Sequence, residues 1–208
     1  MSTERSTERS TERSTRTSAP LTRWRTVDIV IAAVIGVAFG VVFWAWNLLG
    51  TVVGPALAFF APVAAILNGV FLMPGVIGGL VIRKPGAAVF ASTLAAAVSL
   101  LLGSPYGGII IVYGLVQGIG VELGFALTRY RRFGLGATLI AAVTGGLSTS
   151  ILDLSLYYPT WPVAWMASYL GLTVLSSMAL AGLGGWFLVR ALAASGALSS
   201  FPVGQRRL

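Results

Sequence analysis

Long apolar stretches dominate this 208-residue chain, and the short connections between them either contain Lys or Arg or lack both. Apolar runs of about twenty residues are long enough to cross the hydrocarbon core of a membrane as helices. Three connections contain no Lys or Arg. Cytoplasmic connections are enriched in Lys and Arg, so the alternation predicts an all-α integral membrane protein with six transmembrane helices and both termini cytoplasmic. Outside the N-terminal tail, the basic residues at the ends and in the other connections are Arg23, Arg25, Arg83, Lys84, Arg129, Arg131, Arg132, Arg190, Arg206 and Arg207.

The apolar runs divide the chain into three predicted regions. Residues 1–22 are a polar tail with a STER repeat, which we expect to be a disordered cytoplasmic extension. Residues 23–193 are the transmembrane domain, and residues 194–208 are a short basic cytoplasmic segment. The predicted spans are about 28–49, 55–82, 87–102, a run within 103–134, 135–156 and 163–188.

Two features of the first spans predict local structure. Asp28 lies where the N-terminus of the first helix would stabilise a carboxylate, so we expect it to be a cap or a first-turn residue of that helix. The second apolar stretch is longer than a span needs and contains Pro62 and Pro74. A tilt or a break near a proline is therefore expected.

Composition supports the membrane assignment and excludes several functions. The chain is 56% hydrophobic and 10% charged, with a mean hydropathy of +0.88, whereas about a quarter of the residues of soluble domains are charged. The net charge of +8 forms no continuous basic face, so no nucleic-acid partner is expected. There is no Cys and no His, which excludes disulfides and the usual zinc sites. No metal or cofactor is predicted.

The fourth span carries the polar residues that most need an explanation. Glu122 and Gln117 lie among apolar residues, with Tyr113 and Tyr106 nearby. A carboxylate at this depth costs several kcal/mol unless it is neutralised or paired, so a binding role is predicted for it. On an ideal helix, Glu122 lies about 140° around from Gln117. Either the glycines distort this helix, or one of the two side chains contacts a neighbouring helix.

Other spans contribute further candidate ligand contacts, each with a structural alternative. Asn68 either binds ligand or joins helices by a hydrogen bond. Trp44 and Asn47 end the first span, where Trp commonly marks the membrane interface. Asp153 lies near the outer end of the fifth span, within reach of water.

A stripe of small residues on the first span predicts close helix packing. Ala32, Gly36 and Gly40 recur at four-residue steps, which lets a second helix approach closely in lipid. Enzyme functions are disfavoured, because no residue pattern supplies a nucleophile with a base and no GxxxxGK[ST] phosphate loop is present. A non-catalytic binding protein and a small structural or assembly membrane protein without a ligand remain as alternatives.

Several segments resemble the YkoE family, which comprises substrate-binding S components of energy-coupling-factor (ECF) vitamin transporters associated with thiamine and its hydroxymethylpyrimidine precursor. The similarity covers most of the chain after about residue 23 and is most specific in the KPG turn and the QGxGxE run. The segments that carry it are Trp24 to Asp28, IRKPGAA at Ile82 to Ala88, GSPYG at Gly103 to Gly107, and GLVQGIGVELGF at Gly114 to Phe125.

The resemblance implies a six-helix S component with cytoplasmic termini and a vitamin site that opens outward. It also implies a transmembrane coupling subunit and two ATPase subunits as partners. Ala32, Gly36 and Gly40 would then dock the coupling subunit, unless they pack within the chain itself. Glu122 with Gln117 or Asn68 could read the aminopyrimidine of thiamine, and Trp or Tyr faces could hold its thiazolium cation.

Overall fold

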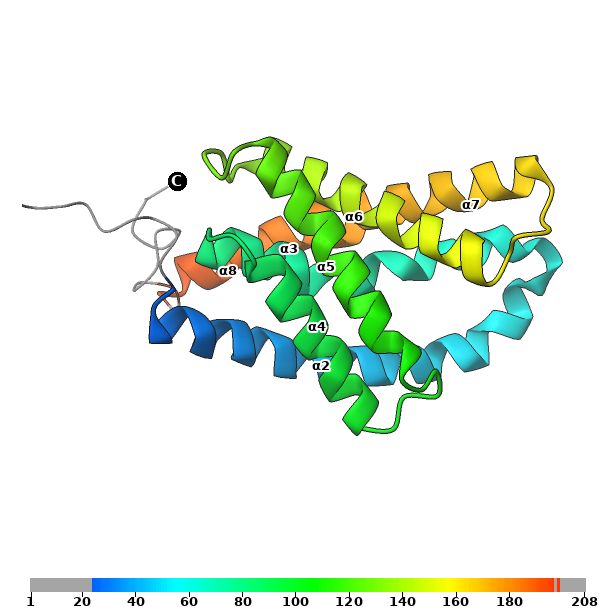
Figure 1. The fold of residues 1–208 in the computed structure, drawn as a ribbon, viewed down its shortest axis with the longest axis horizontal. Helices are drawn as coiled ribbons and strands as arrows, with labels where there is room; N and C mark the ends of the chain where they lie inside the picture. The colour runs from blue at the N-terminus through cyan, green and yellow to red at the C-terminus, as the bar shows by residue number, and fades with distance from the viewer. Residues whose placement is uncertain (1–23, 197, 199–208) are drawn as a thin grey trace, which may run out of the picture.

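The computed structural model describes residues 24–196 and 198, and this part of the chain is helical, without a strand. The tail predicted at 1–22 lies outside the described residues, as does most of the segment predicted at 194–208, including Arg206 and Arg207. The helices pack side by side in one bundle (Figure 1). The elements are α2 (Thr26–Val53), η1 (Gly54–Leu72), α3 (Met73–Ile82), α4 (Ala87–Leu101), α5 (Ile109–Leu127), α6 (Leu135–Leu156), α7 (Val163–Ser176), η2 (Ser177–Gly184) and α8 (Gly185–Ala194).

The helical stretch from Thr26 to Ile82 reverses its direction once. Phe60, two residues before Pro62, has non-helical dihedral angles (φ −143°, ψ 86°), which confirms the predicted break near a proline. Beyond it, η1 and α3 return alongside α2, so that Lys84 forms an ion pair with Asp28 in the first turn of α2 (Figure 1). Asp28 also accepts a hydrogen bond from the backbone N–H of Arg25, the N-cap residue, at 2.7 Å, so of the two predicted positions it takes the first turn.

Four helical stretches in the described part of the chain are long and apolar enough to cross a membrane: Thr26–Ile82, Ile109–Leu127, Leu135–Leu156 and Val163–Ala194. The first of them contains α2 and, running back alongside it, η1 and α3. With 15 residues, α4 is about 22 Å long, shorter than the hydrocarbon core of about 30 Å. The arrangement is compatible with six spans, and the span count and the cytoplasmic termini stay predictions.

The centre of the bundle is α3, whose residues from Pro74 to Ile82 are all buried. Its glycines let neighbouring helices come close: a Cβ atom added at Gly78 would lie 2.9 Å from the Ala91 side chain of α4. Gly79 lies in the same way against the ring of Phe125 from α5. Tight packing around α3 fills the half of the bundle that contains the basic turns.

The small-residue stripe of α2 faces α4 of the same chain. Ala32 is fully buried, and a Cβ added at Gly36 would lie 2.8 Å from the side chain of Leu94. A Cβ at Gly40 would collide with Val98. The stripe therefore makes close contacts inside the bundle, and its role as a docking face for a partner stays a prediction.

Candidate functional site

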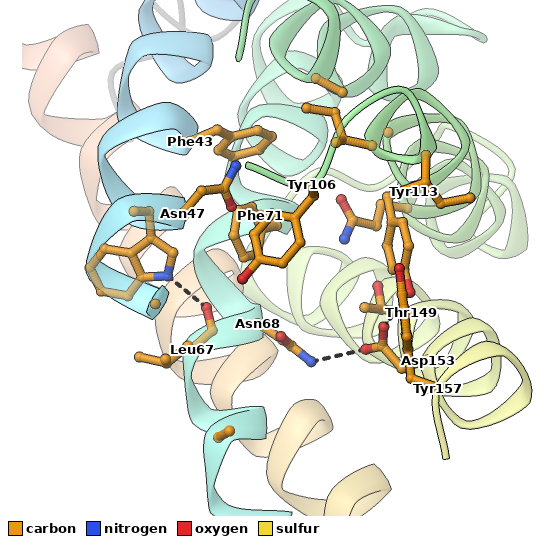
Figure 2. A pocket seen from close by; sticks show the side chains of 18 of the residues that line it. Phe43, Asn47, Leu67, Asn68, Phe71, Tyr106, Tyr113, Thr149, Asp153 and Tyr157 are labelled. Atoms are coloured by element: carbon orange, nitrogen blue, oxygen red, sulfur yellow. Dashed lines mark hydrogen bonds between the residues drawn. The ribbon is translucent and has the colours of Figure 1, made fainter. Parts of the chain in front are cut away.

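A cavity of about 350 Å³ lies at the end of the bundle opposite to the basic turns, between α2, η1, α5, α6 and α7 (Figure 2). Small residues of α2, η1 and α5 are part of its lining, among them Gly50, Gly54 and Gly114. Tyr106, in the connection between α4 and α5, also lines it. Most of the lining side chains are aromatic or aliphatic, and a few polar groups point among them.

Asp153 of α6 is the acidic group that lines the cavity. Its Oδ1 accepts a hydrogen bond from the Tyr113 hydroxyl of α5 at 2.5 Å. Its Oδ2 accepts from the Tyr169 hydroxyl of α7 at 2.7 Å. The same oxygen accepts from Asn68 Nδ2 of η1 at 3.2 Å (Figure 2). Three neutral donors from three elements thus hold a carboxylate that is only 8% exposed. In the part of the chain that the structure describes, no Lys or Arg pairs with it.

Aromatic rings surround this carboxylate. The ring of Tyr157 stacks on that of Tyr113, with centroids 6.5 Å apart, and Tyr158 contacts Tyr169. An aromatic face attracts a cation through the negative side of its quadrupole, most strongly where water is excluded. A buried carboxylate beside several such faces is therefore suited to an organic cation.

Amide side chains form a second polar part of the cavity. Gln117 is 4% exposed and lines the cavity, and within the described residues its side chain makes no hydrogen bond. A buried amide without a protein partner costs free energy unless a ligand or water pairs with it. Asn47 instead donates to Ser104 at 3.1 Å and so holds the connection that carries Tyr106.

The structure places two of the predicted ligand contacts outside the cavity. Trp44 is half-buried and does not line it. Glu122, on another side of α5, accepts hydrogen bonds from the backbone N–H groups of Gly86 at 2.8 Å and Ala88 at 2.9 Å. It also accepts from the hydroxyl of Tyr130 at 2.6 Å. Of the two open possibilities for α5, the helix keeps its regular turn and Glu122 contacts a neighbouring element.

The remaining six predicted contacts come together around the cavity. Several further lining residues were not predicted as ligand contacts. The aromatic connection after α6 and the tryptophans near the end of α2 are the sequence features that could have indicated them. Tyr169 is the most significant of them, because it bonds Asp153 directly. The predicted lining residues are Asn47, Asn68, Tyr106, Tyr113, Gln117 and Asp153, and the additional ones include Phe43, Trp46, Phe71, Thr149, Tyr157, Tyr158 and Tyr169.

Comparison with known proteins identifies similar chains across most of this length. The profile of the family described as "ABC-type cobalt transport system, permease component" matches residues 27–148. An HMP/thiamine permease protein named YkoE, from Bacillus subtilis (strain 168), is 33% identical over 184 residues, which are 88% of this chain and 91% of that protein. A solved structure described as an S-component of an ECF transporter superposes with a TM-score of 0.83 at 32% identity, covering 88% of this chain and 92% of the other.

Proposed function

The chain belongs to the YkoE family of ECF transporter S components and is a multi-pass protein of the cell membrane, and from this premise we propose that its cavity binds thiamine or the hydroxymethylpyrimidine precursor of thiamine. The protein would capture the vitamin from outside the cell for import. The relative from Bacillus subtilis carries both compounds in its name.

The arrangement around Asp153 is the observation that supports this proposal most. Thiamine consists of a neutral aminopyrimidine and a cationic thiazolium. The carboxylate of Asp153, with the rings of Tyr113 and Tyr157, suits the thiazolium. The unpaired amide of Gln117 suits the ring nitrogen and amine of the pyrimidine, because it offers both a donor and an acceptor. We therefore propose thiamine as the preferred ligand and the pyrimidine as the weaker one.

The description of the matching family names cobalt, and the residues of the cavity do not favour that ion. Divalent cobalt binds through imidazole, thiolate or several carboxylates. The chain has no His or Cys, and no group of three or more acidic side chains among the described residues could hold a metal ion. One carboxylate already bonded to three donors leaves no coordination set, so a metal cargo is disfavoured.

We further propose the topology and partners that go with an S component. All basic residues in the described connections lie at one end of the bundle, which supports six spans with both termini in the cytoplasm. The chain lacks a phosphate loop for ATP, so import would need a transmembrane coupling subunit and two ATPase subunits. In this assembly the chain is a binding subunit and catalyses nothing itself.

The test is to titrate the purified protein with thiamine and with hydroxymethylpyrimidine, and to measure binding by calorimetry or by the change in tryptophan fluorescence. The wild type should bind thiamine more tightly than the pyrimidine. Asp153→Asn removes the charge with little change in shape, and should weaken thiamine binding about 10- to 150-fold, the range for one hydrogen bond to a charged group. The neutral pyrimidine should lose less than threefold.

Glu122→Gln is the matched control, because it makes the same acid-to-amide change outside the cavity. Its folded fraction should bind thiamine like the wild type. Unchanged thiamine affinity in a folded Asp153→Asn variant would sink the assignment of the cation site. A folded wild type that binds neither compound would favour the alternative, a structural or assembly membrane protein without a ligand.

A further inference from the structure

The cavity contains one formally charged group and no base. Its lining comprises aromatic and aliphatic side chains, glycines, three amides and one threonine besides Asp153. No Lys or Arg lies among the residues that line it. Most sites that bind phosphate groups use Arg, Lys, a metal ion or a helix N-terminus to offset the charge. The start of α5 lines the cavity, but the N–H groups of Ile110 and Ile111 there already donate to the carbonyl groups of Gly107 and Gly108. Within the cavity, the charged group has the same sign as a phosphate.

The basic residues of the described chain lie far from this cavity. Lys84 is paired with Asp28 at the start of α2, whereas Asn47 lines the cavity near the end of that helix. The 19 residue steps from Asp28 to Asn47 correspond to about 28 Å of helix. The guanidinium groups of Arg83 and Arg190 lie over the rings of Phe133 and Trp186, also away from the cavity lining. None of these cations can reach a ligand held at Asp153.

Buried charges of like sign repel strongly, because the surroundings screen them poorly. A phosphate ester carries about 1.5 to 2 negative charges at neutral pH. Placed in this cavity, it would lose its water and face the Asp153 carboxylate, with hydroxyl and amide donors but no cation to compensate. The donors nearest to Asp153, on Tyr113, Tyr169 and Asn68, are already used by its own oxygens.

We propose that this cavity rejects phosphorylated forms of its ligand, and that Asp153 determines this selectivity. The inference rests on the proposed function, in which the ligand is thiamine. The protein would then take up free thiamine, with its hydroxyl unmodified, and exclude thiamine monophosphate. Charge, not size, is the basis of the exclusion.

Three compounds test this inference on the purified full chain: thiamine, thiamine monophosphate and thiamine O-acetate. The acetate ester extends the same hydroxyl without adding charge, and so separates size from charge. We expect the acetate to bind within tenfold of thiamine, and the monophosphate to bind at least 100-fold more weakly than thiamine. Equal affinity for monophosphate and thiamine would overturn the inference while leaving the proposed function intact. An acetate as weak as the monophosphate would overturn it too, by showing that size excludes both.

Two variants address the role of Asp153 directly. Asp153→Asn should reduce the ratio of thiamine to monophosphate affinity at least tenfold, because it removes the repulsion and the attraction together. Tyr106→Lys adds a base at a half-exposed residue that lines the cavity, and should lower the same ratio with Asp153 still present. Unchanged ratios in both folded variants would contradict the proposal. If the wild type binds none of the three compounds, the proposed function fails, and the inference fails with it.

Discussion

Glu122 needs hydrogen-bond partners, as predicted for a carboxylate among apolar residues, but its partners belong to the protein and not to a ligand. Its carboxylate joins two turns: it accepts from Gly86 and Ala88 at the start of α4, and from Tyr130 beyond α5. A carboxylate at a helix N-terminus is stabilised by the free N–H groups and by the helix dipole. Burial, and then the hydrogen bond to Glu122, raise the pKa of the Tyr130 hydroxyl above its usual range, so Tyr130 stays a donor at physiological pH.

Glu122→Gln should therefore lower the stability of the fold and leave the binding site intact. The amide has one acceptor oxygen in place of two and no charge, which removes or weakens hydrogen bonds worth about 1.5 kcal/mol or more. The measurement is the melting temperature in detergent, together with the thiamine affinity of the folded fraction. Tyr130→Phe removes one of the three donors and should cost less. A tenfold loss of affinity at an unchanged melting temperature would show that Glu122 acts on the ligand after all.

The sequence predicts which residues need partners better than it predicts who the partners are. The free-energy cost of burying Asp153 and Glu122 follows from the apolar residues around them in the sequence, and this cost is of the same kind in any fold. Whether such a carboxylate points into the cavity or toward a turn depends on how α5 and α6 are rotated about their axes. The packing of the neighbouring helices sets this rotation. The helical angle between Gln117 and Glu122 did predict that they diverge, since it needs only the geometry of one helix.

At the scale of elements, boundaries were predictable where chemistry changes abruptly along the chain. The bounds predicted at 87–102 and 135–156 match the helices Ala87–Leu101 and Leu135–Leu156, because basic turns, a Gly-Ser-Pro sequence or a Tyr-Tyr-Pro sequence end the apolar runs. The tighter turns of η1 and the wider turns of η2 were not predictable. They lie side by side. Next to this contact, the N–H of Gly69 in η1 donates to Oγ of Ser176, the last residue of α7, so the two partners are far apart in sequence.

The packing of α2 on α4 leads to a prediction at this scale. Gly40→Leu places a large side chain where even a Cβ collides with Val98, so it should destabilise the protein by about 1 to 3 kcal/mol. Val41→Leu is the control, because Val41 is 50% exposed on the outer face of the same helix. Thermal unfolding of both variants is the measurement. A Gly40→Leu protein that is as stable as wild type but no longer co-purifies with a coupling subunit would instead support the docking role of the stripe.

At the scale of the whole molecule, the bundle has a filled end and a hollow end. Around α3, Ala and Gly residues let helices pack closely, and the basic turns lie at this end. At the other end, the connections are uncharged and aromatic, and the cavity lies between them. The alternation of basic and uncharged connections and the position of the cavity thus define the same axis, and a vitamin taken up from outside would enter at the hollow end.

This axis predicts the orientation of the protein in the cell membrane. Because the chain has no Cys, single substitutions give unambiguous labelling sites. Arg131→Cys, in the turn after α5, and Thr160→Cys, in the aromatic connection after α6, both replace exposed residues at opposite ends of the bundle. In intact cells, an impermeant maleimide should label Thr160→Cys and should label Arg131→Cys only after the membrane is opened, since Lys and Arg favour the cytoplasmic side. Labelling of Arg131→Cys in intact cells with Thr160→Cys protected would invert the topology, and the cavity would then open toward the cytoplasm, where it could not capture a vitamin from outside.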